Sequence, residues 1–325
     1  MPFDVNVKID LAKPVGSVGS WYPLLYVVDA SAEADQYGEY TDLAGIISAG
    51  YTDKTDVYKA ATLMLMQENT PSKFAVLKQK SYSLETFKPY LEKGWRQVIV
   101  VGENASIATM ATDLETVKDK MLFVTVADKA QLKYTTDRTF VVYHTSEENA
   151  AAAVVGATAG YEAGSFTYKN IIIKGVAPVE ISDTELEEIH EAGAITIVEK
   201  AGDIVTSEGK VASGEYADII DSNDYVIQNI EYRIQKLFNN NKKVPYTNAG
   251  IAMLEAAVLG VLKNAYSMGI IAEGDDGNPL YSVNFVLRSG TTEADRAARK
   301  YPYGRFTYTL AGAIHTADVI GTVTV

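Results

Sequence analysis

Short apolar runs alternate with amphipathic segments through the middle of the chain. Uninterrupted apolar strands that alternate with helices are typical of a mostly parallel sheet with both faces covered. The predicted strands are 24–28, 74–77, 98–101, 122–126, 140–143, 171–173 and 195–198. The predicted helices are 53–67, 84–93, 106–118, 147–159 and 183–192. The stretch 30–50, which is small, acidic and dotted with glycine, is expected to be a loop with some helix.

A different pattern follows this alternation. The stretch 203–216 is polar and contains several glycines, which predicts a hairpin that turns near Glu208–Gly209. A long helix is expected next, because apolar residues recur at helical spacing from Ile219 to Leu237. Asp221 or Asp224 lies near the expected start of that helix.

A second long helix, a strand and a short helix are predicted after it. The second helix should have Thr247 or Asn248 as its N-cap and should end before Gly269, which suits the position after a helix C-terminus. A strand is predicted at 281–287 and a short charged helix at 291–300.

Both ends of the chain show strand patterns. The first residues alternate strictly between apolar and polar, and the apolar set is Phe3, Val5, Val7, Ile9 and Leu11. A Pro/Gly/Ser stretch at 13–20 follows and gives reach and flexibility. The last stretch, 305–325, alternates in the same way and ends on Val319, Ile320, Val323 and Val325. Each terminal strand either completes a sheet of its own subunit or adds to a sheet of another subunit, and the spacing leaves both alternatives open.

Composition narrows the class of protein. The 325 residues allow two domains, and a hydrophobic content of 47% is enough for a packed core. The chain has no cysteine, which excludes disulfides and thiolate chemistry and fits synthesis in a reducing cytoplasm. No uninterrupted apolar run reaches the roughly 18 residues that span a membrane, and the first residues lack the layout of a secretory signal. The net charge of −13 argues against non-specific binding to nucleic acid.

Candidate catalytic groups are few and scattered. The three histidines, His144, His190 and His315, show no metal-binding spacing, and only His315, in the expected last strand, is a weak candidate for a pH-sensitive interface group. Gly102 precedes a helix but lacks the other residues of a nucleotide-binding loop. We therefore expect no enzyme activity, no catalytic or metal-binding residue and no cofactor. The alternative is a soluble α/β small-molecule-binding protein or enzyme with a site at the carboxyl ends of the strands.

One stretch has a charge opposite to that of the whole chain. Between Arg288 and Arg305 there are five basic and two acidic residues. Short charged helices are usually solvated and form ion pairs among their own residues. The second interpretation is a positive face that meets an acidic partner surface.

Three stretches of the C-terminal third follow one another in a distinctive order. They are GEYADIIDSNDYVIQNIEYRIQ from Gly214, VPYTNAGIAMLEAAVLGVLKNAYSMGII from Val244, and ARKYPYGRFTYTLAGAIHTADVIGTVTV from Ala298. This succession resembles the C-terminal core of phage contractile-tail sheath proteins, in particular the smaller sheath-like proteins of phage genomes. The resemblance covers about the last third of the chain.

The resemblance implies a fold and a mechanism. Sheath subunits of this kind stack as hexameric rings around a tail tube, and terminal extensions of neighbouring subunits add strands to one another's core sheets. The linked mesh shortens and widens, which drives the tube through the host envelope. The implied partners are other copies of the chain, the tail tube protein, and the baseplate and tail terminator proteins, with no nucleic acid and no membrane insertion. The implied location is the virion tail, after assembly in the host cytoplasm. Another strand-exchanging shell or surface-layer protein is a further alternative.

The resemblance also implies how the chain is divided. The expected fold is α/β (α+β overall), with a mainly parallel α/β body and a C-terminal sheath core domain that carries N- and C-terminal strand arms. The expected regions are an N-terminal arm and linker (1–22), the body (23–200), the core domain (201–312) and a C-terminal arm (313–325). Because the core of sheath proteins faces the tube, the candidates for tube contact are Arg296, Arg299, Lys300 and Arg305.

Overall fold

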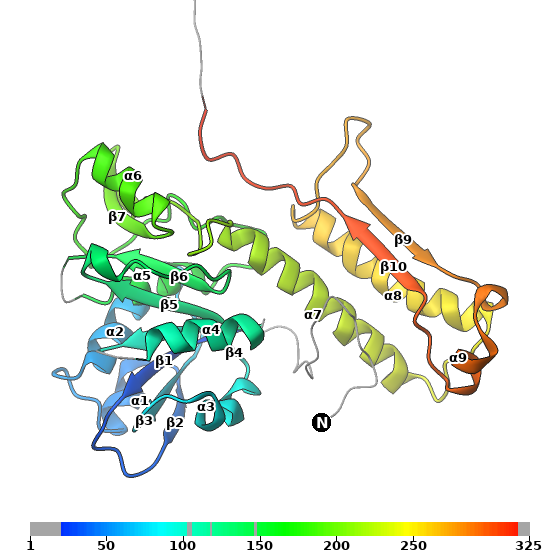
Figure 1. Cartoon of the computed structure of the whole chain (residues 1–325), viewed down its shortest axis with the longest axis horizontal. Coiled ribbons are helices and arrows are strands. Elements are labelled where there is room, and N and C mark those ends of the chain that lie inside the picture. Colours follow the sequence, from blue (N-terminus) through cyan, green and yellow to red (C-terminus); the bar gives the residue numbers. More distant parts are fainter. Residues whose placement is uncertain (1–20, 103–105, 118, 146–147, 318–325) are drawn as a thin grey trace, which may run out of the picture.

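The computed structural model describes residues 21–102, 106–117, 119–145 and 148–317. These residues form an α/β body and a smaller C-terminal domain, which a single long helix, α7, connects (Figure 1). The two expected strand arms, 3–11 and 319–325, lie outside the described residues, so their strand structure stays a prediction.

An eight-stranded sheet forms the centre of the body. Its order is β2-β3-β1-β4-β5-β6-β7-β8, and the six strands from β3 to β7 in this order are parallel. The two edge strands, β2 and β8, are antiparallel to their neighbours. The bounds are β1 Tyr22–Val28, β2 Gln36–Tyr40, β3 Phe74–Gln79, β4 Trp95–Val101, β5 Met121–Val126, β6 Thr139–Tyr143, β7 Ile195–Lys200 and β8 Asp203–Thr206. The mainly parallel α/β body predicted from the sequence is thus confirmed.

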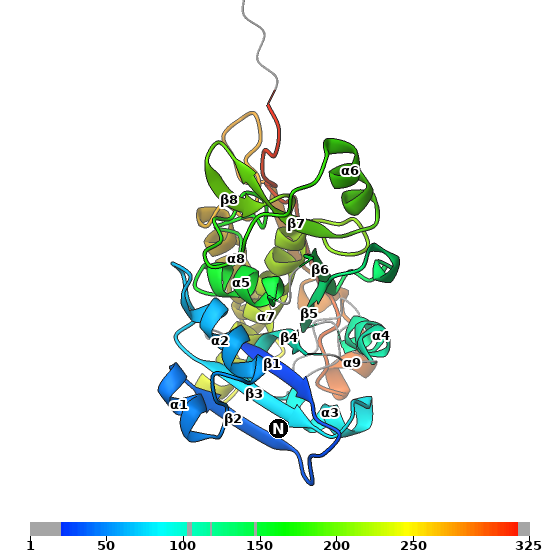
Figure 2. The same cartoon turned by 90° about the vertical axis from the view of Figure 1, so that its left-hand side faces the viewer.

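Helices cover both faces of this sheet, so the body has three layers (Figure 2). One face is covered by α1 (Leu43–Ser48), α2 (Asp56–Leu65) and α5 (Ala150–Thr158). The other is covered by α3 (Leu84–Leu91), α4 (Ile107–Val117) and α6 (Asp183–Glu191). Helices α1, α2, α3, α5 and α6 begin where a side chain accepts a backbone hydrogen bond, and in α6 a complete capping box joins Ser182 and Glu185. A 3₁₀ turn at Lys129–Gln131 lies between β5 and β6.

The alanine-rich helix α5 packs very closely against α2. A Cβ atom placed on Gly156 would lie 2.2 Å from the backbone oxygen of Met64, which leaves no room for a side chain. Every residue of α5 is buried. The small residues of this segment therefore serve close packing, and the element they contact most closely is α2.

The C-terminal domain is a pair of helices covered by a β-hairpin. Its elements are α7 (Ala217–Asn240), α8 (Asn248–Ser267), β9 (Tyr281–Phe285), a 3₁₀ turn at Arg288–Gly290, α9 (Glu293–Ala297) and β10 (Gly304–Tyr308). Thr247 caps α8 by accepting a hydrogen bond from the Gly250 amide, and Gly269 has a positive φ of 79° after its end, both as predicted.

The core of this domain lies between the two helices and the hairpin. It includes Val226 and Ile230 of α7 and Val258 and Leu262 of α8. Among the described residues, α8 is the one helix long and apolar enough to span a membrane by length and composition, although no uninterrupted apolar run of that length was found in the sequence. Its buried face packs on α7 and on the hairpin, as the face of a core helix does.

Several local predictions were wrong. The stretch 30–50 contains an edge strand, β2, and not only loop and helix. The run 171–173 forms no strand and makes one isolated bridge, between Ile172 and Val205. The expected hairpin within 203–216 is instead formed by β7 and β8, with its turn at 201–202, so the sheet of the body continues beyond residue 200.

The last predicted strand and the start of α7 also differ. The strand β10 ends at Tyr308, and residues 311–317 are irregular, so His315 does not lie in a strand. Helix α7 begins at Ala217 after Tyr216, which makes no side-chain cap. Asp221 and Asp224 lie within the helix and are buried, so neither is a capping residue.

Candidate functional site: an assembly surface on the C-terminal domain

The β9–β10 hairpin has one apolar face and one polar face. Tyr281, Val283 and Phe285 alternate with Ser282 and Asn284, and the burial of the strand follows the same period of two. The apolar side chains of both strands pack on the core of α7 and α8. On the opposite face, the hydroxyls of Ser282 and Thr307 are 2.8 Å apart and exposed. The hairpin is therefore a thin layer that covers the helices.

Both outer edges of this hairpin are open within the described residues. The small sheet contains only β10 and β9, with five residue pairs from Gly304↔Phe285 to Tyr308↔Tyr281. In an antiparallel pair, every second residue of each strand directs its amide and carbonyl away from the partner strand. Open edges of this kind are templates for further strands. Each side of the hairpin can accept one more strand.

A buried cluster of charges joins the body to α7. Arg96 of β4 is 1% exposed and donates to Asp221 from Nε, at 3.1 Å, and from Nη2. Its Nη1 also donates to Asp224, which accepts two further hydrogen bonds from Arg138. Burial alone would lower the pKa of Arg96, but Asp221 and Asp224 raise it above its ordinary value. Tyr168 donates to the second oxygen of Asp221 at 2.8 Å.

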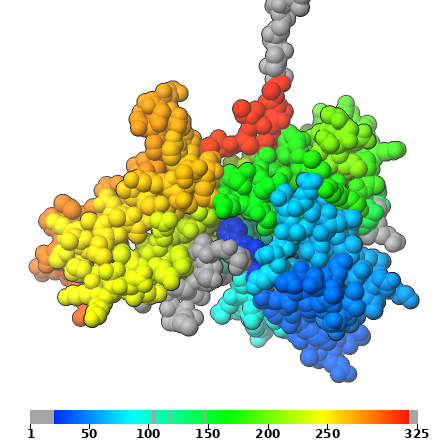
Figure 3. Space-filling model, turned by 180° about the vertical axis from the view of Figure 1, so that it is seen from behind, coloured from blue at the N-terminus to red at the C-terminus, as the bar shows by residue number. Residues whose placement is uncertain are grey.

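The sequence reasoning missed this cluster. The available signal was an arginine two positions before the apolar run 98–101, together with two aspartates three positions apart on one side of an amphipathic helix. Buried charges are normally paired, so an arginine in a buried strand implies an acidic partner elsewhere in the chain. The cluster fixes the direction in which α7 leaves the body, and thereby the position of the C-terminal domain beside the body (Figure 3).

The described chain begins at this same joint. Trp21 donates from Nε1 to Gln228 of α7 at 3.1 Å, and the Arg96 guanidinium lies 4.4 Å from the centre of its indole ring. A cation over an indole face is attracted to it. Trp21, the first described residue, is therefore fixed on α7, one turn beyond Asp224.

The four candidates for tube contact lie at the end of the C-terminal domain distant from the body. Arg299, Lys300 and Arg305 are exposed. Arg296 is partly buried, and it donates to the hydroxyl of Thr291 at 3.0 Å and also to the Thr291 carbonyl. The geometry makes Arg296 a local structural residue and leaves the other three accessible. Lys242 and Lys243, in the turn between α7 and α8, are exposed at the same end of the domain.

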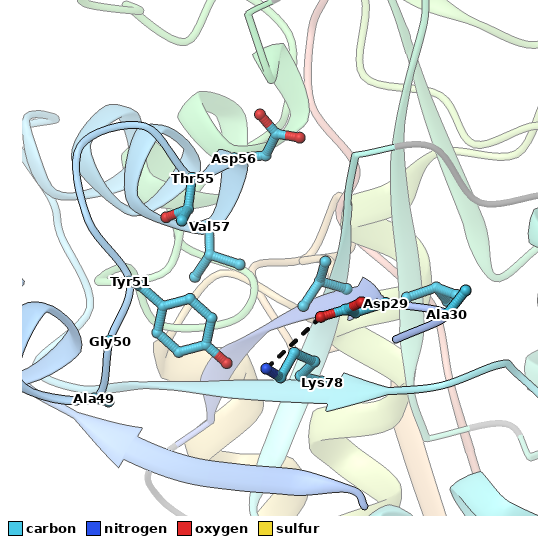
Figure 4. A pocket seen from close by; sticks show the side chains of 11 residues that line it. Asp29, Ala30, Ala49, Gly50, Tyr51, Thr55, Asp56, Val57 and Lys78 are labelled. Carbon is cyan, nitrogen blue, oxygen red and sulfur yellow. Dashed lines mark ion pairs between the residues drawn. The ribbon is translucent and has the colours of Figure 1, made fainter. Parts of the chain in front are cut away.

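The body has an open pocket where a small-molecule site would be expected. A cavity of about 430 Å³ lies at the carboxyl ends of β1 and β3 and at the start of α2 (Figure 4). Asp29 and Lys78 line it and form an ion pair at 3.8 Å. Ligands of parallel α/β sheets bind at such strand ends. No group of three or more potential metal ligands lies here or elsewhere among the described residues.

Comparison with known families identifies the C-terminal third. The family model described as E217 tail sheath protein gp31-like, C-terminal domain, matches residues 217–323. The match begins at the first residue of α7 and includes the two helices and the hairpin. Among curated proteins, no match to the chain was found.

Comparison with solved structures covers nearly the whole chain. The sheath of the extracellular contractile injection system PVC, in its contracted state, aligns with 98% of this chain and 96% of its own, at a TM-score of 0.72 and 14% identity. The contracted helical sheath of the anti-feeding prophage aligns with 98% of both chains, at a TM-score of 0.66 and 14% identity. The sheath tail protein Lin1278 from Listeria innocua aligns with 83% of this chain and 89% of its own, at 0.60 and 9%.

These findings confirm the resemblance predicted from the C-terminal motifs. The identities show a shared fold, and the family match is confined to the segment that begins with α7. Residues 217–323 of this chain thus match the E217 gp31-like tail sheath C-terminal domain, and nearly the whole chain shares the fold of the contractile sheath proteins with which it aligns.

Proposed function

We propose that this protein is the structural subunit of a contractile sheath, which polymerises by exchange of terminal strands between neighbouring subunits. The observation that carries the proposal is the two-stranded β9–β10 sheet, whose outer edges are both unpaired in the described residues of a sheath-type domain. An unpaired strand edge presents amides and carbonyls that an added strand would pair.

The sequence of the terminal segments suits this role. The apolar side chains of 3–11 alternate with a period of two, as an added strand requires if one face is to join the apolar side of the hairpin. The segment 319–325 has the same β-branched character. Main-chain hydrogen bonds to the free edges would supply affinity, and the alternating side chains would set register.

The proposed assembly is a set of stacked rings around a tail tube. Its partners are other copies of this chain, the tube protein, and the proteins of the baseplate and the tail terminator, and its place is a phage tail or a related contractile injection system. The exposed charges of Arg299, Lys300 and Arg305 suit contact with an acidic tube surface. The subunit does no chemistry in this proposal. Conformational energy stored at assembly, released as subunits bury more surface on contraction, drives the movement.

Variants in the first strand test this proposal. Val5→Asp with Ile9→Asp should leave the subunit folded, with an unchanged circular dichroism spectrum, but should stop polymerisation. The control is Asn6→Asp with Lys8→Asn, which makes the same change in net charge at alternate positions. If both double variants polymerise like the parent chain, exchange of this strand is not the basis of assembly.

The alternative function, small-molecule binding at the pocket beside Asp29 and Lys78, predicts a different outcome. A binding protein would keep its oligomeric state when residues 1–12 are deleted. A sheath subunit would stay folded after this deletion and fail to polymerise. Sedimentation velocity of the deleted and full-length chains therefore separates the two functions.

A further inference from the structure

The chain leaves the β9–β10 hairpin and returns to the body. After β10 the Ala311 amide donates to the Ile270 carbonyl at 2.9 Å, which is the last backbone contact of this segment with the C-terminal domain in the described residues. Gly312 then takes a positive φ of 65°, a conformation that favours glycine. From this bend the segment passes from the C-terminal domain towards the body (Figures 1 and 3).

One side chain attaches this segment to the body. Six of the seven residues 311–317 are exposed, and the exception is His315, whose side chain is 11% exposed. Its Nε2 lies 2.9 Å from the hydroxyl of Thr167, and its Nδ1 lies 3.1 Å from a carboxylate oxygen of Glu208. The imidazole also stands edge-on to the ring of Tyr216, with the ring centres 4.9 Å apart.

Glu208, which accepts the hydrogen bond of His315, is itself held in place. Lys169 lies 3.0 Å from Glu208, and the Gly209 amide donates to the Glu208 carboxylate at 2.9 Å. Burial favours the neutral form of Glu208. The Gly209 amide, Lys169 and His315 nevertheless hold the pKa of Glu208 below its ordinary value. Glu208 therefore offers a charged and fixed acceptor to the His315 N–H. The other charged groups around it are Asp218 of α7 and, further off, Lys200, Lys210 and His190.

We propose that His315 is a positioning residue for strand donation, which fixes the point on the body from which the C-terminal arm leaves the subunit. This inference rests on the proposed function. Without the contact, the last fixed residue before the arm would be Ala311. The six further residues up to Ala317 could then extend about 20 Å in any direction. The contact confines the start of the arm. It thereby raises the effective concentration of the arm near the sheet edge that accepts it, and lowers the entropy cost of ordering the arm.

A distance measurement tests the contact itself. Because the chain contains no cysteine, Ala317→Cys and Ser213→Cys introduce two unique labelling sites, both exposed. Spin labels at these sites, in full-length protein diluted with unlabelled protein, should give one narrow distance distribution. His315→Ala and Glu208→Ala should broaden it, and Thr316→Ala, at an exposed neighbouring position, should not. A broad distribution in the parent chain, or a narrow one in the His315→Ala variant, would overturn the proposal.

The protein concentration at which polymerisation begins gives a second test of the role of His315. We expect His315→Ala to raise the threshold protein concentration for polymerisation about tenfold, as loss of one charge-assisted hydrogen bond would. His315→Gln, whose amide can donate to Glu208, should recover most of this loss, and the melting temperature of the subunit should not change in either variant. An unchanged threshold, or a lowered one, contradicts the proposal. If the parent chain never polymerises, the proposed function fails, and the distance distribution still decides whether His315 fixes the segment.

Discussion

Arg96 of β4 and Asp224 of α7, which are 128 positions apart in the sequence, form a buried ion pair across the joint between the body and the C-terminal domain. Both side chains are at most 3% exposed. The pair, with Asp221 and Arg138, makes α7 a rigid extension of the sheet. A loose joint would let the hairpin move independently of the body.

Removal of the Arg96 side chain should therefore lower the stability of the subunit. Arg96→Ala leaves Asp221 and Asp224 buried with less compensation, and we expect the free energy of unfolding to fall by about 3–5 kcal/mol. The measurement is urea unfolding of the subunit. The matched control is Lys73→Ala, which removes a partly exposed ion pair with Glu39 at 2.8 Å and should cost less than about 1 kcal/mol. Equal costs for the two variants would contradict a structural role for the cluster.

The same face of α7 carries a carboxylate with an unusual pKa. Glu231 is 8% exposed, and burial, with a smaller effect of Asp119, raises its pKa from 4.5 to about 7. The unfolded chain thus loses this proton at lower pH than the folded chain, so the contribution of Glu231 to stability falls as the pH rises from about 4.5 to about 7. We expect Glu231→Gln to raise the melting temperature more at pH 8 than at pH 4. A gain independent of pH would show that the pKa of Glu231 is the same in the folded and the unfolded chain.

Charge reversal at the far end of the C-terminal domain tests the tube contact. We expect Arg299→Glu with Lys300→Glu to weaken assembly on tail tubes, because both side chains are exposed and would then repel an acidic surface. Lys54→Glu with Lys80→Glu makes the same change in net charge on the body and is the control. Normal extended tails with the first pair would remove these residues from the tube contact. Arg296 is left out because its contacts with Thr291 give it a local structural role.

The close packing of α5 on α2 gives a prediction about stability. Gly156→Val would place a branched side chain against the backbone of Met64, and we expect a loss of about 1–3 kcal/mol in the free energy of unfolding. Gly156→Ala should cost less, since only one carbon is added. Thermal unfolding of both variants checks the order. A stable Gly156→Val protein would mean that α2 and α5 can separate without loss.

Regular periodic elements were predictable from the sequence. The six parallel strands were found from their apolar runs and α2, α3, α4, α6 and α8 from their amphipathic spacing, with a predicted cap for α8 alone, since these signals are local. The edge strand β2 was missed because its residues, QYGEY, are mostly polar and include a glycine. An edge strand has one partner strand and is partly solvated, so it lacks the apolar run of a central one.

The features that connect the two domains were not predictable in the same way. The contact of His315 with Glu208 joins residues 107 positions apart, and that of Arg96 with Asp224 joins residues 128 apart. The sequence shows the types of these residues but not which cation meets which carboxylate. The resemblance of the C-terminal motifs to sheath proteins agrees with the family model that matches this segment, and the three motifs correspond in order to α7, α8 and the strand β10.

Electron microscopy of the purified full-length protein, with size-exclusion chromatography alongside, tests the central claim most directly. A sheath subunit should form long hollow cylinders with a wide lumen, or ordered sleeves once tail tubes are added. Val5→Asp with Ile9→Asp should abolish both forms. A uniform small particle at every concentration, unchanged by tail tubes, would contradict the account and favour an α/β protein that acts through the pocket beside Lys78.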